Sequence, residues 1–274
     1  MAACARDLIE GCGLPRLEAR MLLERALDVN RAWLIAHDAD PLPDERVAVF
    51  REWAGRRLRG EPMAYLLGER EFMGHVFQVT PAVLIPRPET ELLVETALAD
   101  LRDRPAPRVL DLGTGSGAIA IAIALARPDA RVEATDLSPD ALGVAAANAD
   151  RLGAAVALHQ GDWYEALKHR DAAPIYDLIV SNPPYIAADD AHLSQGDLRY
   201  EPATALTDRA DGLQALRAIV AGAPAWLRRG GALWVEHGWD QAAQVRDLLT
   251  AAGLCGVGSR RDLAGIERIS GGYL

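Results

Sequence analysis

The sequence predicts an α/β protein in which a mostly parallel sheet follows a small helical bundle. Beyond position 108, short apolar runs alternate with stretches of helical periodicity, whereas the N-terminal stretch carries helical spacing without strand signals. A chain of 274 residues can form one large domain or two unequal ones. Repeated strand and helix alternation implies a sheet that helices cover on both faces. Ligands of such sheets bind beyond the carboxyl ends of the strands.

The stretch from Ala2 to about Gly60 is expected to be helical. Pro41 and Pro43 divide it, and Pro62 is expected to end it. Residues 1–71 are therefore predicted to form an N-terminal helical domain. The apolar residues that recur at the helical spacings of three and four are Leu17, Met21, Leu22, Val47, Phe50, Trp53 and Ala54.

The pattern changes between Phe72 and Leu84, where apolar residues alternate with polar or small ones. This alternation predicts a hairpin or a linker strand. We therefore place a hairpin linker at residues 72–86 and the second domain at residues 87–274.

A helix is expected from Pro88 to about Leu101, and five short apolar strands follow it. The stretch from Ala187 to Gly212 is long, polar and without periodicity, which is typical of a functional loop. The predicted strands are Arg108 to Leu112, Arg131 to Thr135, Ala155 to His159, Asp177 to Ser181 and Ala232 to Glu236.

Composition and charge exclude several classes of protein. Half of the residues are hydrophobic and a quarter are charged, which is typical of a globular protein and not of a disordered or fibrous one. The formal charge of −10 is spread over both predicted domains, so no broad basic surface for nucleic acid is expected.

No membrane segment is expected either. The longest nearly unbroken apolar run, Ala118 to Ala126, is about half of the roughly 20 residues that a spanning helix needs. The three cysteines, Cys4, Cys12 and Cys255, are scattered, so neither a disulfide framework nor a metal cluster is predicted. A reducing cytoplasm fits this pattern best.

A glycine-rich segment directly follows the first strand of the predicted sheet. It reads Gly113-Thr114-Gly115-Ser116-Gly117 and precedes the apolar helix that starts at Ala118. Glycines let the backbone turn tightly and approach a ligand, and the helix N-terminus behind them favours negative groups. A nucleotide-like cofactor is the natural interpretation, although Gly113, Gly115 and Ala118 also fit the dinucleotide pattern.

Asp136 follows the second strand, 19 residues after Gly117. A carboxylate at this place can accept hydrogen bonds from both ribose hydroxyls of either cofactor class. The alternative role of Asp136 is to cap the helix that begins near Pro139, for which Ser138 is the better candidate. Asp136 therefore supports an adenosine group without choosing the cofactor.

The fourth strand ends in Asn182-Pro183-Pro184-Tyr185, and this motif decides between the two cofactor classes. The two prolines fix the backbone and leave carbonyl groups without local amide partners. The Asn182 side chain adds an acceptor beside the Pro183 carbonyl, so a planar NH₂ group could donate one proton to each oxygen. Tyr185 offers a flat wall for that group.

Together, these motifs resemble those of class I S-adenosylmethionine-dependent amino-methyltransferases, and nearly the whole chain resembles the PrmC/HemK family. This resemblance implies a Rossmann-like class I methyltransferase sheet with a small N-terminal helical bundle joined by a β-hairpin. Family members methylate the glutamine of the Gly-Gly-Gln motif in peptide-chain release factors, which affects translation termination. The further segments that carry the resemblance are Ile85 to Glu91, Asp162-Trp163, Asp197 to Pro202 and Glu236-His237-Gly238.

The resemblance also implies roles for individual residues. It places Gly113 to Gly117 against the methionine end of S-adenosylmethionine, Asp136 on the ribose and Trp163 along the adenine. Asn182 to Tyr185 would hold the substrate glutamine, with Asn182 also close to the cofactor. Catalysis would fall to Asn182, Pro183 and Tyr185 without a metal. Arg199 and Glu201 are expected to form a solvated charge pair in the long loop.

Three alternatives stay open. A DNA or RNA amino-methyltransferase shares the core motifs but usually carries a basic surface. An NAD-dependent oxidoreductase explains the glycines and Asp136 but leaves Asn182 to Tyr185 without a function. A binding module without catalysis would not need the Asn182 motif at all.

The expected partners are class-one release factors, with no nucleic acid and no membrane, and the chain is expected to be a monomer. The glutamine pocket alone recognises only an amide, so discrimination needs a second surface. We expect the N-terminal helices to provide it, with the cluster of Arg51, Arg56, Arg57 and Arg59 as the candidate contact.

Overall fold

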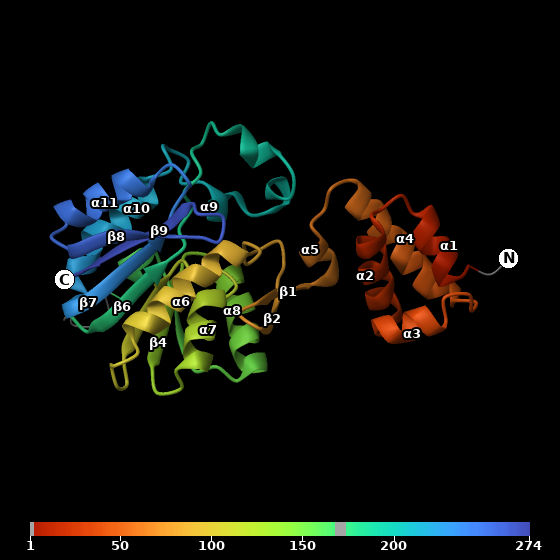
Figure 1. The fold of residues 1–274 in the computed structure, drawn as a ribbon, viewed down its shortest axis with the longest axis horizontal. Helices are drawn as coiled ribbons and strands as arrows, with labels where there is room; N and C mark the ends of the chain where they lie inside the picture. The colour runs from red at the N-terminus through yellow and green to blue at the C-terminus, as the bar shows by residue number, and fades with distance from the viewer. Residues whose placement is uncertain (1–2, 168–173) are drawn as a thin grey trace. The chain divides into compact units, whose positions relative to one another are not determined.

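The computed structural model describes residues 3–167 and 174–274 and divides the chain into two compact units (Figure 1). The helical unit comprises the chain up to Glu69 together with Gln195–Tyr200. The sheet unit comprises Arg70–Ser194 and Glu201–Leu274. Ala2, where the predicted helical stretch begins, lies outside the described residues.

The helical unit packs its helices around one apolar cluster, to which Leu22, Val47 and Phe50 contribute. Leu17 and Met21, which share the helical spacing, are partly exposed and lie outside this cluster. The predicted helical stretch does end before Pro62, at Leu58, and Pro62 then precedes a further short helix that was not predicted. The helices are α1 (Ala5–Gly11), α2 (Arg16–Leu27), α3 (Arg31–Ala36), α4 (Asp44–Leu58) and α5 (Met63–Leu67).

The hairpin begins earlier in the chain than predicted. Strand β1 (Glu69–Phe72) and strand β2 (His75–Gln78) form a two-stranded sheet of their own. Met73 and Gly74 connect them, both with positive φ angles. The boundary between the two units falls inside β1.

The sheet unit contains a seven-stranded sheet with the order β5-β4-β3-β6-β7-β9-β8. The five strands from β3 to β7 pair in parallel, and β9 runs antiparallel to both of its neighbours. The predicted α/β class with a mostly parallel sheet is therefore confirmed. The strands are β3 (Arg108–Leu112), β4 (Arg131–Asp136), β5 (Val156–Gln160), β6 (Tyr176–Ser181), β7 (Leu227–Glu236), β8 (Cys255–Arg261) and β9 (Glu267–Tyr273).

Alternating strand residues bury opposite faces of this sheet. Leu178 and Val180 of β6 pack in one apolar cluster, whereas Ile179 between them packs in another. The first cluster includes the helices α6 (Glu91–Asp100), α7 (Ala118–Ala126) and α8 (Pro139–Leu152). The second includes α10 (Gln214–Gly222) and α11 (Ala242–Ala251) (Figure 1). The sheet is thus covered on both faces, which leaves its edge at the strand ends for ligands.

Short helices fill the connections, including the stretch from 187 to 212 that lacks periodicity. They are η1 (Pro88–Thr90), η2 (Trp163–Leu167), η3 (Ala191–Ser194), η4 (Leu198–Tyr200), α9 (Ala203–Leu206) and η5 (Ala223–Ala225). Across the described residues, no helix is both long and apolar enough to cross a membrane.

Strands β8 and β9 escaped the sequence analysis because glycine and charged residues interrupt them. Gly271 is nevertheless required in β9. A Cβ atom at this position would lie 2.3 Å from the Leu233 carbonyl oxygen and 2.3 Å from Trp234 Cδ2 on β7. The pairing of β9 with β7 therefore depends on a residue without a side chain.

We predict that Gly271→Ala lowers the free energy of unfolding by about 1 to 3 kcal/mol, because overpacking forces the two strands apart. Thermal unfolding should show a fall in Tm of roughly 2 to 4 °C per kcal/mol. The matched control is Gly258→Ala in β8, where no described atom lies within 4 Å of the added Cβ. Equal Tm values for the two variants would contradict the prediction.

Candidate active site

A cavity of about 400 Å³ opens at the carboxyl ends of the parallel strands. This volume is within the usual range for small-molecule sites. Each connection after β3, β4, β5 and β6 contributes to its wall, as does the segment that leads into α6. The lining residues include Ala82 to Leu84, Pro86, Arg87, Thr90, Gly113 to Ser116, Thr135 to Ser138, Gly161 to Trp163, Asn182, Pro184, Pro202, Thr204 and Ala205.

The three glycines of the loop after β3 all adopt positive φ angles, between 55° and 82°. Such angles favour glycine, and at two of the glycines an added Cβ atom would also be crowded. A Cβ atom on Gly113 would lie 3.1 Å from the Trp163 ring, and one on Gly117 would lie 2.7 Å from Ile121 Cδ1. Gly113 and Gly115 line the cavity, whereas Gly117 supports the start of α7.

Asp136 lines the cavity and is held by the backbone on two sides. Its carboxylate oxygens accept hydrogen bonds from the Gly115 amide at 2.8 Å and from the Ser138 amide at 2.9 Å. A carboxylate has further lone pairs, so Asp136 can still accept protons from ligand hydroxyls. Partial burial raises its pKa above the ordinary value. As predicted, Ser138 caps α8, by accepting from the Ala141 amide.

Asp111 lies beneath the same loop and is fully buried. Its carboxylate accepts a hydrogen bond from the Thr114 hydroxyl at 2.6 Å, which ties the loop to the end of β3. Burial raises the pKa of Asp111 to about 7, and the Thr114 bond opposes part of that shift. The sequence analysis assigned no role to this residue.

Trp163 lies between the cavity and an apolar core. Its ring lines the cavity next to Gly113, and the side chain also packs against the core beneath α10. The residue has a φ angle of +44°, an uncommon conformation for a side chain of this size.

The motif after β6 divides between the cavity and the protein interior. Asn182 and Pro184 line the cavity, whereas Pro183 and Tyr185 are not among its described lining residues. The Asn182 side-chain nitrogen donates to the Thr90 hydroxyl at 3.1 Å. The Tyr185 hydroxyl donates to a Glu236 oxygen at 3.3 Å. Burial raises the pKa of Tyr185 above its ordinary range.

Thr90 and Glu236 are site residues that the sequence analysis did not single out. Glu236 is 2 % exposed and also accepts from the Thr90 hydroxyl at 2.7 Å. Burial raises the pKa of Glu236 to about 7, while its hydrogen bonds from Thr90 and Tyr185 oppose that shift. The two residues are 146 positions apart. The sole sequence signal was their place in the segments that carry the family resemblance.

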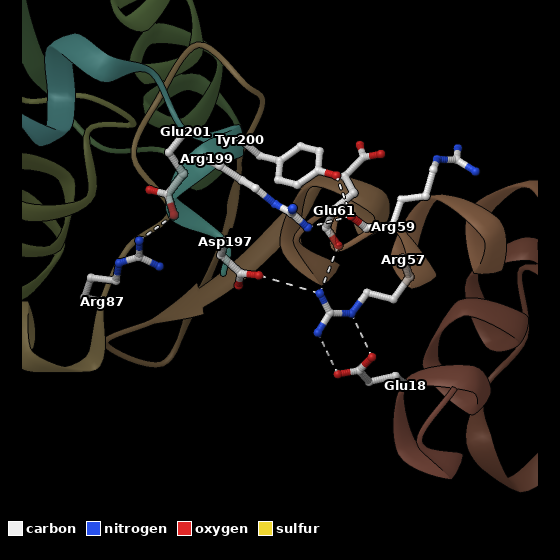
Figure 2. Close-up of polar contacts among 9 residues, drawn as sticks. All are labelled: Glu18, Arg57, Arg59, Glu61, Arg87, Asp197, Arg199, Tyr200 and Glu201. Carbon is white, nitrogen blue, oxygen red and sulfur yellow. Dashed lines mark hydrogen bonds and ion pairs between the residues drawn. The ribbon is translucent and has the colours of Figure 1, made fainter. Parts of the chain in front are cut away.

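Arg199 and Glu201 do not form the solvated pair that was expected. Glu201 is buried and belongs to the sheet unit, where it forms an ion pair with Arg87. Arg199 belongs to the helical unit, where it donates to the Arg59 carbonyl oxygen at 2.6 Å (Figure 2). The Tyr200 hydroxyl donates to the same oxygen at 2.9 Å.

Two arginines of the proposed docking cluster are engaged inside the helical unit. Arg57 forms two hydrogen bonds with the Glu18 carboxylate, at 2.7 and 3.0 Å, and an ion pair with Asp197 (Figure 2). Arg56 pairs with Glu61. Both guanidinium groups are thus already paired with carboxylates, whereas Arg51 and Arg59 are exposed. The docking role of the cluster stays a prediction.

The fold and the site together define a class I methyltransferase. The defining features are a sheet that helices cover on both faces, the glycine loop after its first strand and the Asn182 motif after its fourth. Two family descriptions match the chain, "PrmC N-terminal domain" over residues 3–68 and "Methyltransferase small domain" over residues 88–197. Within the described residues, no group of three or more His, Cys, Asp or Glu side chains could hold a metal ion.

Comparison with curated proteins identifies the family. The release factor glutamine methyltransferase of Bordetella pertussis is 66% identical over 269 residues, which cover 98% of both chains. The release factor glutamine methyltransferase of Burkholderia pseudomallei is 54% identical over 278 residues, covering 99% of this chain and 96% of the relative. The chain belongs to the family of release factor glutamine methyltransferases, and it is a methyltransferase enzyme.

A solved structure supports the fold. The 16S rRNA N2 G1207 methyltransferase of T. thermophilus, in complex with AdoMet and guanosine, superimposes with a TM-score of 0.55 at 20% identity. The match covers 75% of this chain and 49% of that one. It concerns the methyltransferase fold alone.

The buried carboxylate of Asp111 predicts a pH-dependent stability. Its raised pKa means that the folded state binds a proton that the unfolded state has already lost between about pH 4 and pH 7. Its contribution to stability therefore falls as the pH rises through that interval. Asp111→Asn removes this penalty, so the Tm of the variant relative to wild type should rise by several degrees from pH 5 to pH 8.

The control for this measurement is Asp129→Asn. Asp129 is exposed, and its hydrogen bonds with Arg127 and the Ala106 amide lower its pKa to about 2. It is thus ionised in both states between pH 5 and pH 8, and its replacement should give a constant Tm difference. A constant difference for Asp111→Asn as well would refute the assignment of a buried proton.

Proposed function

We propose that this enzyme transfers a methyl group from S-adenosylmethionine to the side-chain amide nitrogen of the glutamine in the Gly-Gly-Gln motif of peptide-chain release factors. Such a modification would affect translation termination. The observation that carries this proposal is the Asn182 motif at the end of β6, on the wall of the cavity that the glycine loop and Asp136 also line. The names of the family relatives point to the same reaction.

The residues of the cavity fit the proposed cofactor. Gly113 to Gly117 form a loop whose lining backbone is free of side chains at Gly113 and Gly115, and Asp136 keeps lone pairs for ribose hydroxyls. Trp163 presents a flat ring beside this loop, suited to a purine. When bound, S-adenosylmethionine would supply a methyl group activated by a positively charged sulfur.

The protein must orient a weak nucleophile, because the lone pair of an amide nitrogen is delocalised into its carbonyl. The Asn182 side-chain oxygen and the Pro183 carbonyl oxygen would accept the two hydrogens of the substrate amide. As that nitrogen gains positive charge, its hydrogens become stronger donors, so these two acceptors stabilise the transition state more than the ground state. Alignment of bound reactants can contribute the equivalent of roughly 7 to 11 kcal/mol.

Tyr185 would support this arrangement from the interior side. Its hydroxyl is held by Glu236, so the ring has a fixed place next to the Pro184 backbone. In this scheme no general base is required before attack, because the amide proton becomes acidic only after the new bond has formed. Asn182, Pro183 and Tyr185 are the proposed catalytic group.

The helical unit is the proposed docking domain for the release factor. In place of the predicted bounds of 1–71, this unit comprises the chain up to Glu69 together with Gln195–Tyr200, and the hairpin of β1 and β2 leads from it to the proposed methyltransferase domain. Because Arg56 and Arg57 pair with carboxylates in the chain, the exposed Arg51 and Arg59 are the remaining cationic candidates. We further propose a cytoplasmic monomer that does not bind nucleic acid.

The decisive experiment measures transfer of a labelled methyl group to purified release factors. Intact factors should be labelled, and factors with the Gly-Gly-Gln glutamine replaced should not. A short peptide with the same motif should be labelled more slowly than the intact factor if docking contributes. Label on RNA or DNA, with none on the factors, would favour the nucleic-acid alternative.

Asp136→Ala should weaken binding of S-adenosylmethionine and of its demethylated product by roughly tenfold or more, since lost hydrogen bonds to a ligand typically cost on the order of 1 to 3 kcal/mol. Calorimetry measures this directly. Asp140→Ala, an exposed carboxylate in the first turn of α8, is the matched control and should bind as wild type does. Undiminished affinity in Asp136→Ala would rule out the proposed ribose contact, and tight binding of NAD would rule out the proposed cofactor.

Asn182→Ala should reduce turnover by about a hundredfold or more, because one of the two transition-state acceptors is lost. The glycine loop and Asp136 are untouched, so the variant should still fold and bind the cofactor. Asn182→Asp should keep part of the activity, since a carboxylate still accepts hydrogen bonds. Normal turnover in the alanine variant would mean that this motif has only a structural role.

A further inference from the structure

The side chain of Asn182 is the end of a buried chain of hydrogen bonds that starts at Glu236. The Thr90 hydroxyl donates to Glu236 Oε2 at 2.7 Å, and the Asn182 side-chain nitrogen donates to the Thr90 hydroxyl at 3.1 Å. Thr90 and Glu236 are 4 % and 2 % exposed. Water therefore has little access to replace either of these bonds.

The strand register explains why these groups meet. Strands β6 and β7 pair in parallel, with Ser181 beside Val235, so the next residues, Asn182 and Glu236, lie at neighbouring strand ends. Thr90 comes from the last position of η1, at the start of α6. Three segments far apart in the sequence thus converge on one hydroxyl group.

The direction of each hydrogen bond follows from the carboxylate. An ionised carboxylate only accepts, so the single hydroxyl proton of Thr90 is committed to Glu236. The Thr90 oxygen can then only accept from its other neighbour, and the Asn182 amide must turn its NH₂ group toward it. The oxygen of the same planar amide is consequently the group left for the substrate.

We propose that Glu236 is a positioning residue that acts through Thr90 to fix the Asn182 amide with its oxygen available to the substrate NH₂ group. The inference rests on the proposed function, since it assigns a purpose to the Asn182 acceptor. Without an acceptor-only group at position 236, the Thr90 hydroxyl can donate to Asn182 instead. The rotated amide would then present NH₂ to NH₂, and two donors cannot bind each other.

The ionisation of Glu236 adds a second readout. Its pKa is raised to about 7 by burial. The hydroxyls of Thr90 and Tyr185 and the charge of Arg268 oppose that shift, and the charge of Glu89 adds to it. Protonation below neutral pH would remove the acceptor-only character, so kcat should rise with pH through this region as the carboxylate ionises.

The test compares variants of the full chain in the methylation assay with an intact release factor. Thr90→Val removes the hydroxyl at nearly constant volume and should lower kcat about tenfold to a hundredfold, with cofactor affinity unchanged. Its kcat should also lose the rise with pH near 7. Thr90→Ser restores the hydroxyl and should recover most of the activity and the pH dependence, whereas a structural role for the Thr90 methyl group predicts no recovery.

Glu236→Gln should lower kcat to a similar degree, because the new amide can donate to Thr90. The matched control is Glu133→Gln. Glu133 is a buried carboxylate on β4 that pairs with Arg108 and His159 and does not belong to the described cavity wall. This variant should keep the wild-type kcat and pH profile, even where its Tm changes.

A double-mutant cycle separates positioning from general damage. In the Asn182→Ala background the amide no longer exists, so adding Thr90→Val should cause no further loss of kcat. Further loss by the full single-mutant factor, or wild-type kcat in Thr90→Val, would overturn the inference. A wild-type enzyme that labels no release factor would instead overturn the proposed function, so the two failures are distinct.

Discussion

The site depends on one constraint, the parallel pairing of five consecutive strands. Parallel strands bring their carboxyl ends to a single edge, and each strand from β3 to β7 ends there in a polar segment. The glycine loop, Asp136, Trp163, Asn182 and Glu236 belong to five different connections or strand ends. Strand pairing alone therefore brings together groups that are far apart in the sequence.

The apolar faces of the sheet protect this arrangement. Alternating residues of β3, β6 and β7 enter two separate cores, and helices cover each of these cores, so the strands are packed on both faces. The same burial places two carboxylates, Asp111 and Glu236, where ionisation is unfavourable. Each carboxylate accepts hydrogen bonds from a segment near the cavity. Asp111 accepts from the Thr114 hydroxyl, and Glu236 accepts from the hydroxyls of Thr90 and Tyr185.

Local patterns in the sequence were enough to predict much of the fold and part of the candidate site. The five parallel strands, the glycine turn and the Ser138 cap each depend on residues that are neighbours in the sequence, so periodicity and spacing reveal them. Strands β8 and β9 depend instead on pairing, β9 with β7 and β8 with β9. In β9, Gly271 is tolerated because β7 fills its space, and Gly272 because residues of β8 lie close to it. Such a strand has no apolar run that a local rule could detect.

Contacts between distant segments were beyond the reach of local patterns. Thr90 and Glu236 meet only because the register of β6 and β7 places two strand ends side by side near the start of α6. The arginines near the end of α4 looked like an available basic cluster, because nothing in their spacing indicates that Glu18 and Asp197 neutralise Arg57. A count of like charges in one segment cannot predict which of them are already paired.

Within the long loop, two consecutive residues make their contacts in different units. Tyr200 is anchored to the Arg59 carbonyl in the helical unit, and the next residue, Glu201, is anchored to Arg87 in the sheet unit. One peptide bond thus links two sets of contacts. Glu201 is followed by Pro202, which lines the cavity, so the helical unit has a covalent connection to the cavity wall that is only a few residues long. The covalent link between the helical unit and the cavity wall therefore does not run through the hairpin alone.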